Sequence, residues 1–435
     1  MEKSIESMYI LKDIFSFLSK KRSLEIIIYN KHLQNQLDIG LEDYKRISNI
    51  YRKGKRNGKG MEYNKKTNIM EFEGEYLNGK RNGKGKEYYS CDKLKFEGEY
   101  LNGERSGKGK EYYYDGKLIF EGEYLYGKRW NGKGYNKESK IEFEIKEGNG
   151  KVKEYYKDGE LKYEGEYLYG KRNGKGKEYY HDKIEYEGEY INGKRNGKGK
   201  EYYYDGKLKF EGEYLNEKRW NGKGYNKEGY NNFEIIEGNG KVIEYYQYDE
   251  LKFIGEYVNG EKNGKGKEYY RNGELKFEGE YSNGERNGKG KEYYSNGKLE
   301  FIGEYLYGER NGKGKEYYDG KLEFEGEYLN GRRNGNGKEY YNCELKYEGK
   351  YLNGIRNGKG KEYKGYGELE FEGEYLNGKR IGKGKEYYYN GKLKYEGEYL
   401  NGERNGKGKE YNDDGKLEYE GEYLNGRRNE KCKIF

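Results

Sequence analysis

Glycine and basic residues alternate in the stretch GKRNGKG, residues 79–85, in a way that could hold a phosphate group. A nucleotide-binding P-loop places four residues between its key glycines and follows its lysine with Ser or Thr, which binds magnesium. Here three residues separate Gly79 from Gly83, and Gly85 stands after Lys84. The stretch also recurs more than ten times along the chain, whereas a nucleotide site occurs once or twice. We therefore interpret it as a strand-connecting turn.

Histidine and cysteine, which often support catalysis or bind metal, are rare in this chain. His32 and His181 are the only histidines, and Cys91, Cys343 and Cys432 are the only cysteines. None of them has neighbours at the spacing of a zinc site or a catalytic triad. We expect no catalytic residue, no metal site, no cofactor, no small-molecule substrate and no enzymatic activity.

The composition narrows the class of protein. Hydrophobic residues make up 31% of the 435 residues and charged residues 39%, which is too little apolar mass for a large central core. The aromatic content of 17% nevertheless favours order over disorder. The net charge of +8 is the small difference between 88 basic and 80 acidic residues, so we expect no nucleic-acid partner. No apolar run approaches the roughly 18 residues of a membrane span, and the few scattered cysteines indicate a reduced, cytoplasmic protein.

An internal repeat dominates the chain. The pentapeptide aromatic-x-Gly-Glu/Lys-Tyr begins fourteen times between residues 72 and 419, in steps of 23 or 24 residues except for two steps of 43. Each long step contains a degenerate unit, one beginning at Phe143 and one at Phe233. A half-matched unit opens the array near Ile47. We count about 17 units, and atypical units at both ends are usual in stacked arrays.

Within a unit the turn residues indicate a β-hairpin. YYYDGKLIFEGEY, residues 112–124, carries Asp115-Gly116 between two aromatic-rich runs, and this dipeptide suits a two-residue type I′ turn. That turn would place Tyr113 opposite Leu118. It would also place Glu111 opposite Phe120, Gly109 opposite Gly122, Lys110 opposite Glu121 and Lys108 opposite Glu123. One face would then be aromatic and the other would pair opposite charges.

Two residue types on the aromatic face need an explanation. Gly109 and Gly122 would leave slots there for neighbouring aromatic rings, because a glycine otherwise weakens a strand. Glu111 does not fit an apolar face, so either a bulge redirects it or the face stays partly wet. The units together predict an all-β fold. It would be an elongated, single-layer antiparallel meander of about 17 hairpins.

This pattern resembles the MORN repeat family over roughly nine-tenths of the chain. The matching positions are Phe96, Gly98, Tyr100, Asn102, Gly103, Gly107 and Gly109, and Tyr113 and Leu118 complete the unit. The sequence departs from the family in carrying Tyr where Trp is frequent, and in Trp130 and Trp220 beside the degenerate units. Those two rings either pack against the irregular units or anchor a partner. The resemblance implies scaffolding, membrane apposition or self-association, without catalysis by the repeats.

Residues 1–46 lack the repeat and form a separate region from the array at 47–435. Leu11, Ile14, Phe15 and Leu18 have the spacing of a helical stripe, so we expect a small helical leader. One interpretation is a cap over the first exposed strand edge. The alternative is an F-box-like module that recruits a ubiquitin ligase, because LKDIFSFL resembles the LxxIxxxL opening of that family, although its usual Pro and Trp are missing.

Basic residues recur at one end of the units and could form a row along one edge. The candidates are Lys80, Arg81, Lys84, Lys171, Arg172, Lys175, Lys194, Arg195 and Lys198. Such a row would attract an anionic membrane or an acidic partner. It could equally be a solvated edge that resists aggregation, and several units carry Glu in place of Lys, as at Glu104 and Glu261.

These observations favour a non-catalytic repeat scaffold that binds a protein partner or itself. The alternatives are a peripheral membrane tether acting through the basic row, and a substrate adaptor if the leader is F-box-like. We expect a cytoplasmic protein, either free or peripheral at a membrane or a cytoskeletal structure.

Overall fold

The computed structural model describes residues 50–90, 92–246 and 250–429. The leader at 1–46, His32, Cys91 and Cys432 lie outside the described residues. The chain divides between residues 249 and 250 into two compact units, which we describe separately. Apart from one 3₁₀ turn, η1 (Gly365–Gly367), every element in the described residues is a β-strand.

The first unit contains β1 to β18. Their bounds are β1 (Ile50–Gly54), β2 (Gly58–Asn64), β3 (Met70–Leu77), β4 (Lys80–Tyr88), β5 (Leu94–Leu101), β6 (Glu104–Tyr112), β7 (Leu118–Leu125), β8 (Lys128–Tyr135), β9 (Ile141–Ile145), β10 (Gly150–Tyr155), β11 (Leu161–Leu168), β12 (Lys171–Tyr180), β13 (Lys183–Ile191), β14 (Lys194–Tyr202), β15 (Leu208–Leu215), β16 (Lys218–Tyr225), β17 (Asn231–Ile235) and β18 (Gly240–Tyr245).

The second unit contains β19 to β34. Their bounds are β19 (Leu251–Val258), β20 (Glu261–Tyr269), β21 (Leu275–Ser282), β22 (Glu285–Tyr293), β23 (Leu299–Leu306), β24 (Glu309–Tyr318), β25 (Lys321–Leu329), β26 (Arg332–Tyr341), β27 (Glu344–Leu352), β28 (Ile355–Tyr363), β29 (Leu369–Leu376), β30 (Lys379–Tyr387), β31 (Leu393–Leu400), β32 (Glu403–Tyr411), β33 (Leu417–Leu424) and β34 (Arg427–Arg428).

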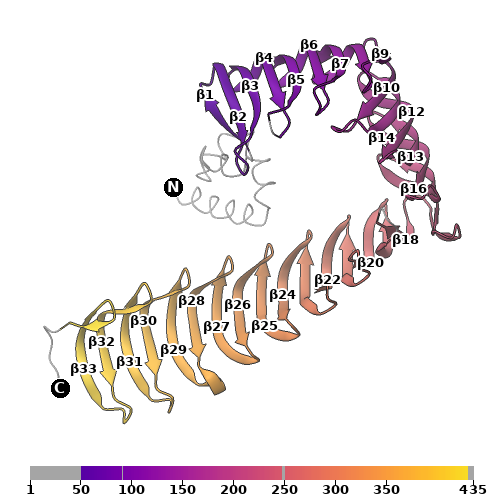
Figure 1. Cartoon of the computed structure of the whole chain (residues 1–435). Helices are drawn as coiled ribbons and strands as arrows, with labels where there is room; N and C mark the ends of the chain where they lie inside the picture. The colour runs from indigo at the N-terminus through magenta and orange to yellow at the C-terminus, as the bar shows by residue number, and fades with distance from the viewer. Residues whose placement is uncertain (1–49, 91, 247–249, 430–435) are drawn as a thin grey trace, which may run out of the picture. The chain divides into compact units, whose positions relative to one another are not determined.

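The strands form antiparallel hairpin meanders. Strand order follows chain order within each unit: β1 to β9 and β10 to β17 form sheets in the first unit, and β19 to β34 form a sheet in the second. Figure 1 shows the arched strands of the second unit from β24 to β33, each beside the next one along the chain. The predicted all-β meander of antiparallel hairpins is therefore confirmed.

The predicted register of β6 and β7 is correct over four residue pairs and wrong at the turn. Glu111 pairs with Phe120 as predicted. The one glycine pair and the two Lys–Glu pairs are also in the predicted register. Leu118, however, pairs with Tyr112 and not with Tyr113, because a bulge follows Glu111. Gly116 has a φ of 87° and its N–H donates to the Tyr113 carbonyl at 2.9 Å. The connection, residues 113–117, is thus longer than the predicted type I′ turn, and Ile119 is the unpaired residue of the bulge.

The interpretation of the whole stretch GKRNGKG as a turn is wrong, because only its first residue, Gly79, lies in the turn. Only Asn78 and Gly79 connect the strands, with φ values of 52° and 81°, and Leu77 pairs directly with Lys80. This is the two-residue connection with positive φ at both positions that Asn-Gly favours. The remaining residues belong to β4 (Lys80–Tyr88), where Gly83 adopts a φ of 87° beside a bulge.

The core is a single file of aromatic rings on one face of each sheet. Phe96 is fully buried and packs edge-on against Tyr100 and Tyr124, at centroid distances of 5.7 and 5.1 Å. A Cβ on Gly109 would lie 2.6 Å from Cζ of the Phe96 ring. The glycines therefore leave room for the rings, as predicted, and each regular repeat buries one ring over a glycine pair.

Arginine and glutamate cover these rings. The Arg105 guanidinium lies 3.9 Å from the centroid of the Phe96 ring, a cation–π contact. It donates to the Glu87 carboxylate at 2.7 Å, and the Tyr100 hydroxyl donates to the same carboxylate at 2.8 Å. Glu111 has the equivalent partners Arg129 and Tyr124 one repeat later. Glu111 therefore stays on the aromatic face, where it pairs with arginine.

The degenerate units keep the meander with shorter strands. β9 (Ile141–Ile145) and β10 (Gly150–Tyr155) contribute Ile145 and Val152 to the buried face. The Gly148 N–H donates to the Trp130 carbonyl at 2.7 Å, and a Cβ on Gly148 would lie 2.9 Å from the Trp130 ring. Trp130 thus lies against the turn of the degenerate unit, and Trp220 accepts the same backbone bond from Gly238.

Candidate binding groove

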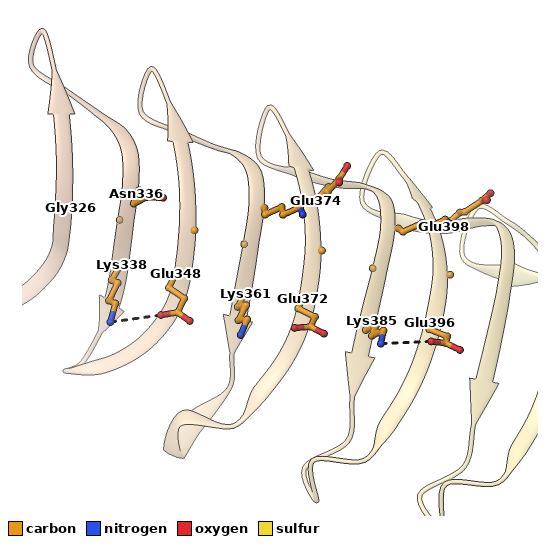
Figure 2. Close-up of a pocket in the computed structure, with 18 of the residues that line it drawn as sticks. Gly326, Asn336, Lys338, Glu348, Lys361, Glu372, Glu374, Lys385, Glu396 and Glu398 are labelled. Atoms are coloured by element: carbon orange, nitrogen blue, oxygen red, sulfur yellow. Dashed lines mark ion pairs between the residues drawn. The ribbon is translucent and has the colours of Figure 1, made fainter.

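The face opposite the aromatic rings carries lysine and glutamate, and we call it the Lys/Glu face. In the second unit this face forms a groove of about 1800 Å³ that runs from β23 to β33. Lysines, glutamates and the backbone of paired glycines make up nearly all of its lining. Figure 2 shows these side chains on successive arched strands. Lys338 and Glu348 lie on the neighbouring strands β26 and β27, and Lys385 and Glu396 lie on β30 and β31.

One line of charges along the groove consists of ion pairs between neighbouring strands. Lys315 lies 3.0 Å from Glu325, and Lys409 lies 3.3 Å from Glu420. The Lys338–Glu348 and Lys385–Glu396 pairs are looser, at 3.8 and 4.0 Å. We call this line the paired ladder. Such exposed pairs contribute little stability, at most about 1 kcal/mol each.

A second line of charges lies two residues along each strand from the paired ladder, toward the two-residue hairpin turns, and has a different arrangement. The Glu304 carboxylate accepts the backbone N–H of Lys313 at 3.1 Å, and the Glu398 carboxylate accepts that of Lys407 at 3.3 Å. Gly312, at the bulge, makes this possible, because a Cβ there would lie 2.0 Å from the Glu304 carboxylate. These carboxylates therefore bind the backbone and not the lysine ammonium groups.

The lysines of this second line remain available to a partner. Within the described residues, no ion pair within 4.0 Å involves Lys313, Lys359, Lys383 or Lys407. All four line the groove. We call them the bulge lysines. They occupy alternate strands, so about 9.6 Å separates one from the next where the repeat is regular.

The predicted basic row separates into three environments. Arg81, Arg172 and Arg195 lie on the aromatic face, where they pair with Glu62, Glu154 and Glu178. Lys80, Lys171 and Lys194 are exposed beside the hairpin turns. Lys84, Lys175 and Lys198 lie on the Lys/Glu face opposite Glu99, Glu189 and Glu213. The structure therefore brings the lysines to the surface and places the arginines among carboxylates.

Burial and arginine act in opposite directions on the carboxylates of the aromatic face. Burial alone would raise the pKa of Glu111, but the neighbouring Arg129 and Arg105 guanidinium groups hold that pKa at about 2. The pKa of Glu87 is lowered for the same reason by Arg105, against the effect of its burial. These groups stay ionised at neutral pH and support the fold.

The predicted repeat positions occupy structural roles. Phe96, Tyr100 and Tyr113 are buried, and the Tyr113 hydroxyl donates to the Tyr135 carbonyl at 3.2 Å. Gly103 and Gly107 have φ values of 98° and 70°. Gly98 lies against Gly109 and the Phe96 ring, and Leu118 opens β7.

The other candidates for chemistry stay dispersed. His181 is exposed and its Nδ1 lies 2.9 Å from the Glu160 carboxylate, while Cys343 is a free, exposed thiol. The described residues contain no cluster of His, Cys, Asp and Glu that could hold a metal ion. Nor do they include a helix of sufficient length and apolarity to cross a lipid bilayer.

Comparison with known proteins identifies the repeat. The MORN repeat model matches twelve segments, at 50–65, 72–90, 96–117, 163–183, 186–207, 253–274, 277–298, 301–321, 324–342, 347–365, 395–416 and 419–434, and these cover more than half of the chain. The chain belongs to the MORN repeat family. A MORN repeat variant model matches two further segments, at 149–169 and 380–401. The resemblance in the sequence is thereby confirmed.

Comparison with whole proteins adds little. No curated protein matches this MORN chain. A solved structure, TcdB2-TccC3 without its hypervariable C-terminal region, aligns over 88% of this chain at 10% identity and a TM-score of 0.12. The aligned part is 24% of the length of that protein.

Sequence reasoning missed the residues that distinguish one MORN unit from another. Among the fourteen Gly-Glu/Lys-Tyr sites only Lys350 replaces glutamate. In the same hairpin Ile355 stands where other units carry a charged residue after the Asn-Gly turn. The signal was present, because a repeat makes each departure visible by comparison with its own copies.

Proposed function

We propose that this protein is a non-catalytic MORN scaffold that binds protein partners along the Lys/Glu face. The observation that carries the proposal is the continuous groove over β23 to β33, whose lining repeats with the hairpins. A groove built from equivalent units offers an extended partner many similar contacts. Repeat proteins commonly use surfaces of this kind for recognition.

The charge of the groove supports a protein partner over a polyanion. Nine lysines and nine glutamates line it, so the two signs balance. A nucleic acid or an anionic membrane would meet as many carboxylates as ammonium groups and would gain little from counterion release. A protein segment can present both signs in turn, and such complementarity favours specificity.

The experiment compares chains that lack two whole repeats. Deletion of residues 324–370 removes β25 to β28, and deletion of residues 277–323 removes β21 to β24, and both leave the repeat in phase. Proximity labelling in the native cell should identify partners of the full chain. Each partner is then purified, and its affinity for the full chain and for both deletions is measured by calorimetry.

The scaffold proposal expects both deletions to weaken binding, because contacts are distributed over many units. Replacement of a single paired-ladder residue, as in Lys385→Gln, should change the affinity less than about twofold, since one exposed pair contributes little. Failure to find any protein that binds the purified chain would contradict the proposal.

A further inference from the structure

Three departures from the repeat meet in two adjacent hairpins of the second unit. Lys350 in β27 replaces the glutamate of other units, Ile355 in β28 replaces a charged residue, and Ile381 in β30 replaces asparagine or another polar residue in the regular units. All three lie on the Lys/Glu face, because Lys350 alternates with the buried Tyr351, Ile355 pairs with Leu352, and Ile381 pairs with Glu374.

The first departure removes a contact that other hairpins make. In β23 and β31 the equivalent glutamates accept a backbone N–H at the bulge. Lys350 has no acceptor atom, and its Cδ lies 3.4 Å from the Cβ position of Gly358. The replacement therefore costs a local hydrogen bond and gives the hairpin nothing in return. Sites that break a local rule in this way are often functional.

The same replacement changes the local charge. Lys350 pairs in register with Asn336, which stands where regular units carry a bulge lysine. Lys359 follows in β28 and lines the groove. Across β26 to β28 the second line of charges therefore carries two lysines and no carboxylate. Three successive strands of regular units carry two lysines and one glutamate at these positions. The charge of this line is therefore more positive here than in regular units.

The second departure creates an exposed apolar patch beside these lysines, and the half-buried Ile381 adds apolar surface in the next hairpin. Ile355 and its cross-strand partner Leu352 are 48% and 50% exposed, and Leu376 in the next hairpin is 50% exposed. Cγ2 of Ile355 lies 3.4 Å from the Cβ position of Gly378, so the patch continues onto the β29–β30 turn. In other units a charged residue stands at the position of Ile355, between the exposed leucines of successive hairpins. Exposed apolar patches with a charged rim are typical of interaction sites.

We propose that β27 to β30 anchor an acidic segment of a protein partner that carries apolar side chains. Its carboxylates would bind Lys350 and Lys359, and its apolar side chains would cover Leu352, Ile355 and Leu376. This inference rests on the scaffold function proposed above and names the site that fixes the position of the partner. Identical repeats cannot fix that position, because a segment bound to them could shift by one unit at no cost.

The spacing suggests the probe. Successive repeats are about 9.6 Å apart, the width of two strands, and three residues of an extended polyproline II chain span about 9.3 Å. A peptide of Leu-Glu-Ser triplets, about twelve residues long, would present a leucine and a carboxylate to each unit. Its fluorescein-labelled form is titrated with the full chain, and binding is followed by fluorescence anisotropy.

The variants return the departing positions to the residues of other units. Lys350→Glu, Ile355→Lys and Ile381→Asn should preserve the hairpins, because the same residues occur at these positions elsewhere in the array. Lys84→Glu and Leu101→Lys make matched changes at exposed residues of the first unit. Circular dichroism verifies that each variant is folded.

The expected result is measurable binding of the peptide by the unaltered chain and a loss of about tenfold in the triple variant, with less than about twofold in the two controls. A glutamine version of the peptide should bind as weakly as the triple variant does. Equal binding by the triple variant, or no binding by the unaltered chain, would overturn the inference. It would also be overturned if phosphatidylserine vesicles bound through these residues and the peptide did not. A partner whose affinity falls equally when residues 324–370 or residues 277–323 are deleted would refute this site and leave the scaffold function intact.

Discussion

The Arg105 guanidinium in β6 donates to the Glu87 carboxylate in β4 at 2.7 Å, across the strand that lies between them. The two residues belong to successive repeats, 18 positions apart. The same contact joins Arg172 to Glu154 at 2.9 Å. Each hairpin is therefore tied to the next by a partly buried ion pair as well as by the backbone ladder. This coupling between neighbours allows a sheet with no second layer to hold its core.

Replacing Arg105 with alanine should destabilise the hairpins on both sides of it. The change leaves the Glu87 carboxylate without its strongest partner and exposes the Phe96 ring that the guanidinium covers. Removing one partner from a buried ion pair costs about 3–5 kcal/mol, and we expect the lower end of that range because this pair is only partly buried. Native-state hydrogen exchange of the β4 to β6 amides measures this cost locally, which matters because a repeat array need not unfold in one step.

The exposed pair Lys110–Glu121 provides the control for this variant. Its nitrogen and oxygen are 3.0 Å apart, but the side chains are 44% and 47% exposed. Lys110→Ala should therefore cost less than about 1 kcal/mol. If both alanine variants accelerated exchange equally, the arginine network would have no special role in joining the repeats.

Replacing Gly109 with alanine should disturb the core without altering charge. The added methyl group would lie 2.6 Å from the Phe96 ring, which is enclosed by two tyrosines and cannot move freely. Overpacking of this kind costs about 1–3 kcal/mol. Gly365 is the matched control, since its Cβ position meets no atom closer than 3.8 Å. Thermal denaturation should show a lower midpoint for Gly109→Ala and an unchanged midpoint for Gly365→Ala.

Acid should weaken the fold through its carboxylates. The pKa of Glu111 is about 2 in the folded chain, against 4.5 for the unperturbed group. A carboxyl group with a lowered folded pKa stabilises the native state above its unfolded pKa, and this stability is lost as the pH falls. We expect local stability around β6 to β8 to decline between about pH 4.5 and pH 2. Hydrogen exchange at several pH values should show that local stability declines less steeply with falling pH in Glu111→Gln than in the unaltered chain. An equally steep decline would contradict the role given to Glu111.

The hairpin register could be predicted from the sequence because several constraints agreed. Opposite charges at Lys110 and Glu121 and the glycine pair at 109 and 122 all required one alignment, and a slip of one residue would have moved every side chain to the other face. The turn could not be predicted as well. Both Asn-Gly and Asp-Gly indicate tight connections, and only the structure shows that the extra tyrosine lengthens the connection between β6 and β7 and that Ile119 forms a bulge.

The arginine network and the groove were beyond the sequence analysis for a physical reason. Two-strand pairing compares residues within one hairpin, whereas Arg105 reaches Glu87 across a third strand. The predicted basic row treated Arg81 and Lys84 as equivalent, although alternation places them on opposite faces. The groove depends on the arch of the strands, and a repeat pattern gives no direct measure of that curvature.

Returning Lys350 to glutamate should stabilise the β27–β28 hairpin even though it weakens the proposed docking site. A carboxylate there would accept the backbone N–H at the bulge, as Glu304 does from Lys313 at 3.1 Å. It would also replace the positive charge at position 350 with a negative one near Lys359. A net hydrogen bond contributes about 1 kcal/mol, so Lys350→Glu should slow amide exchange in β27 and β28 by about fivefold. Lys350→Gln, which supplies a neutral acceptor, should recover part of this gain. Faster exchange in Lys350→Glu would mean that lysine serves the fold, and the reason for treating this position as a binding residue would be lost.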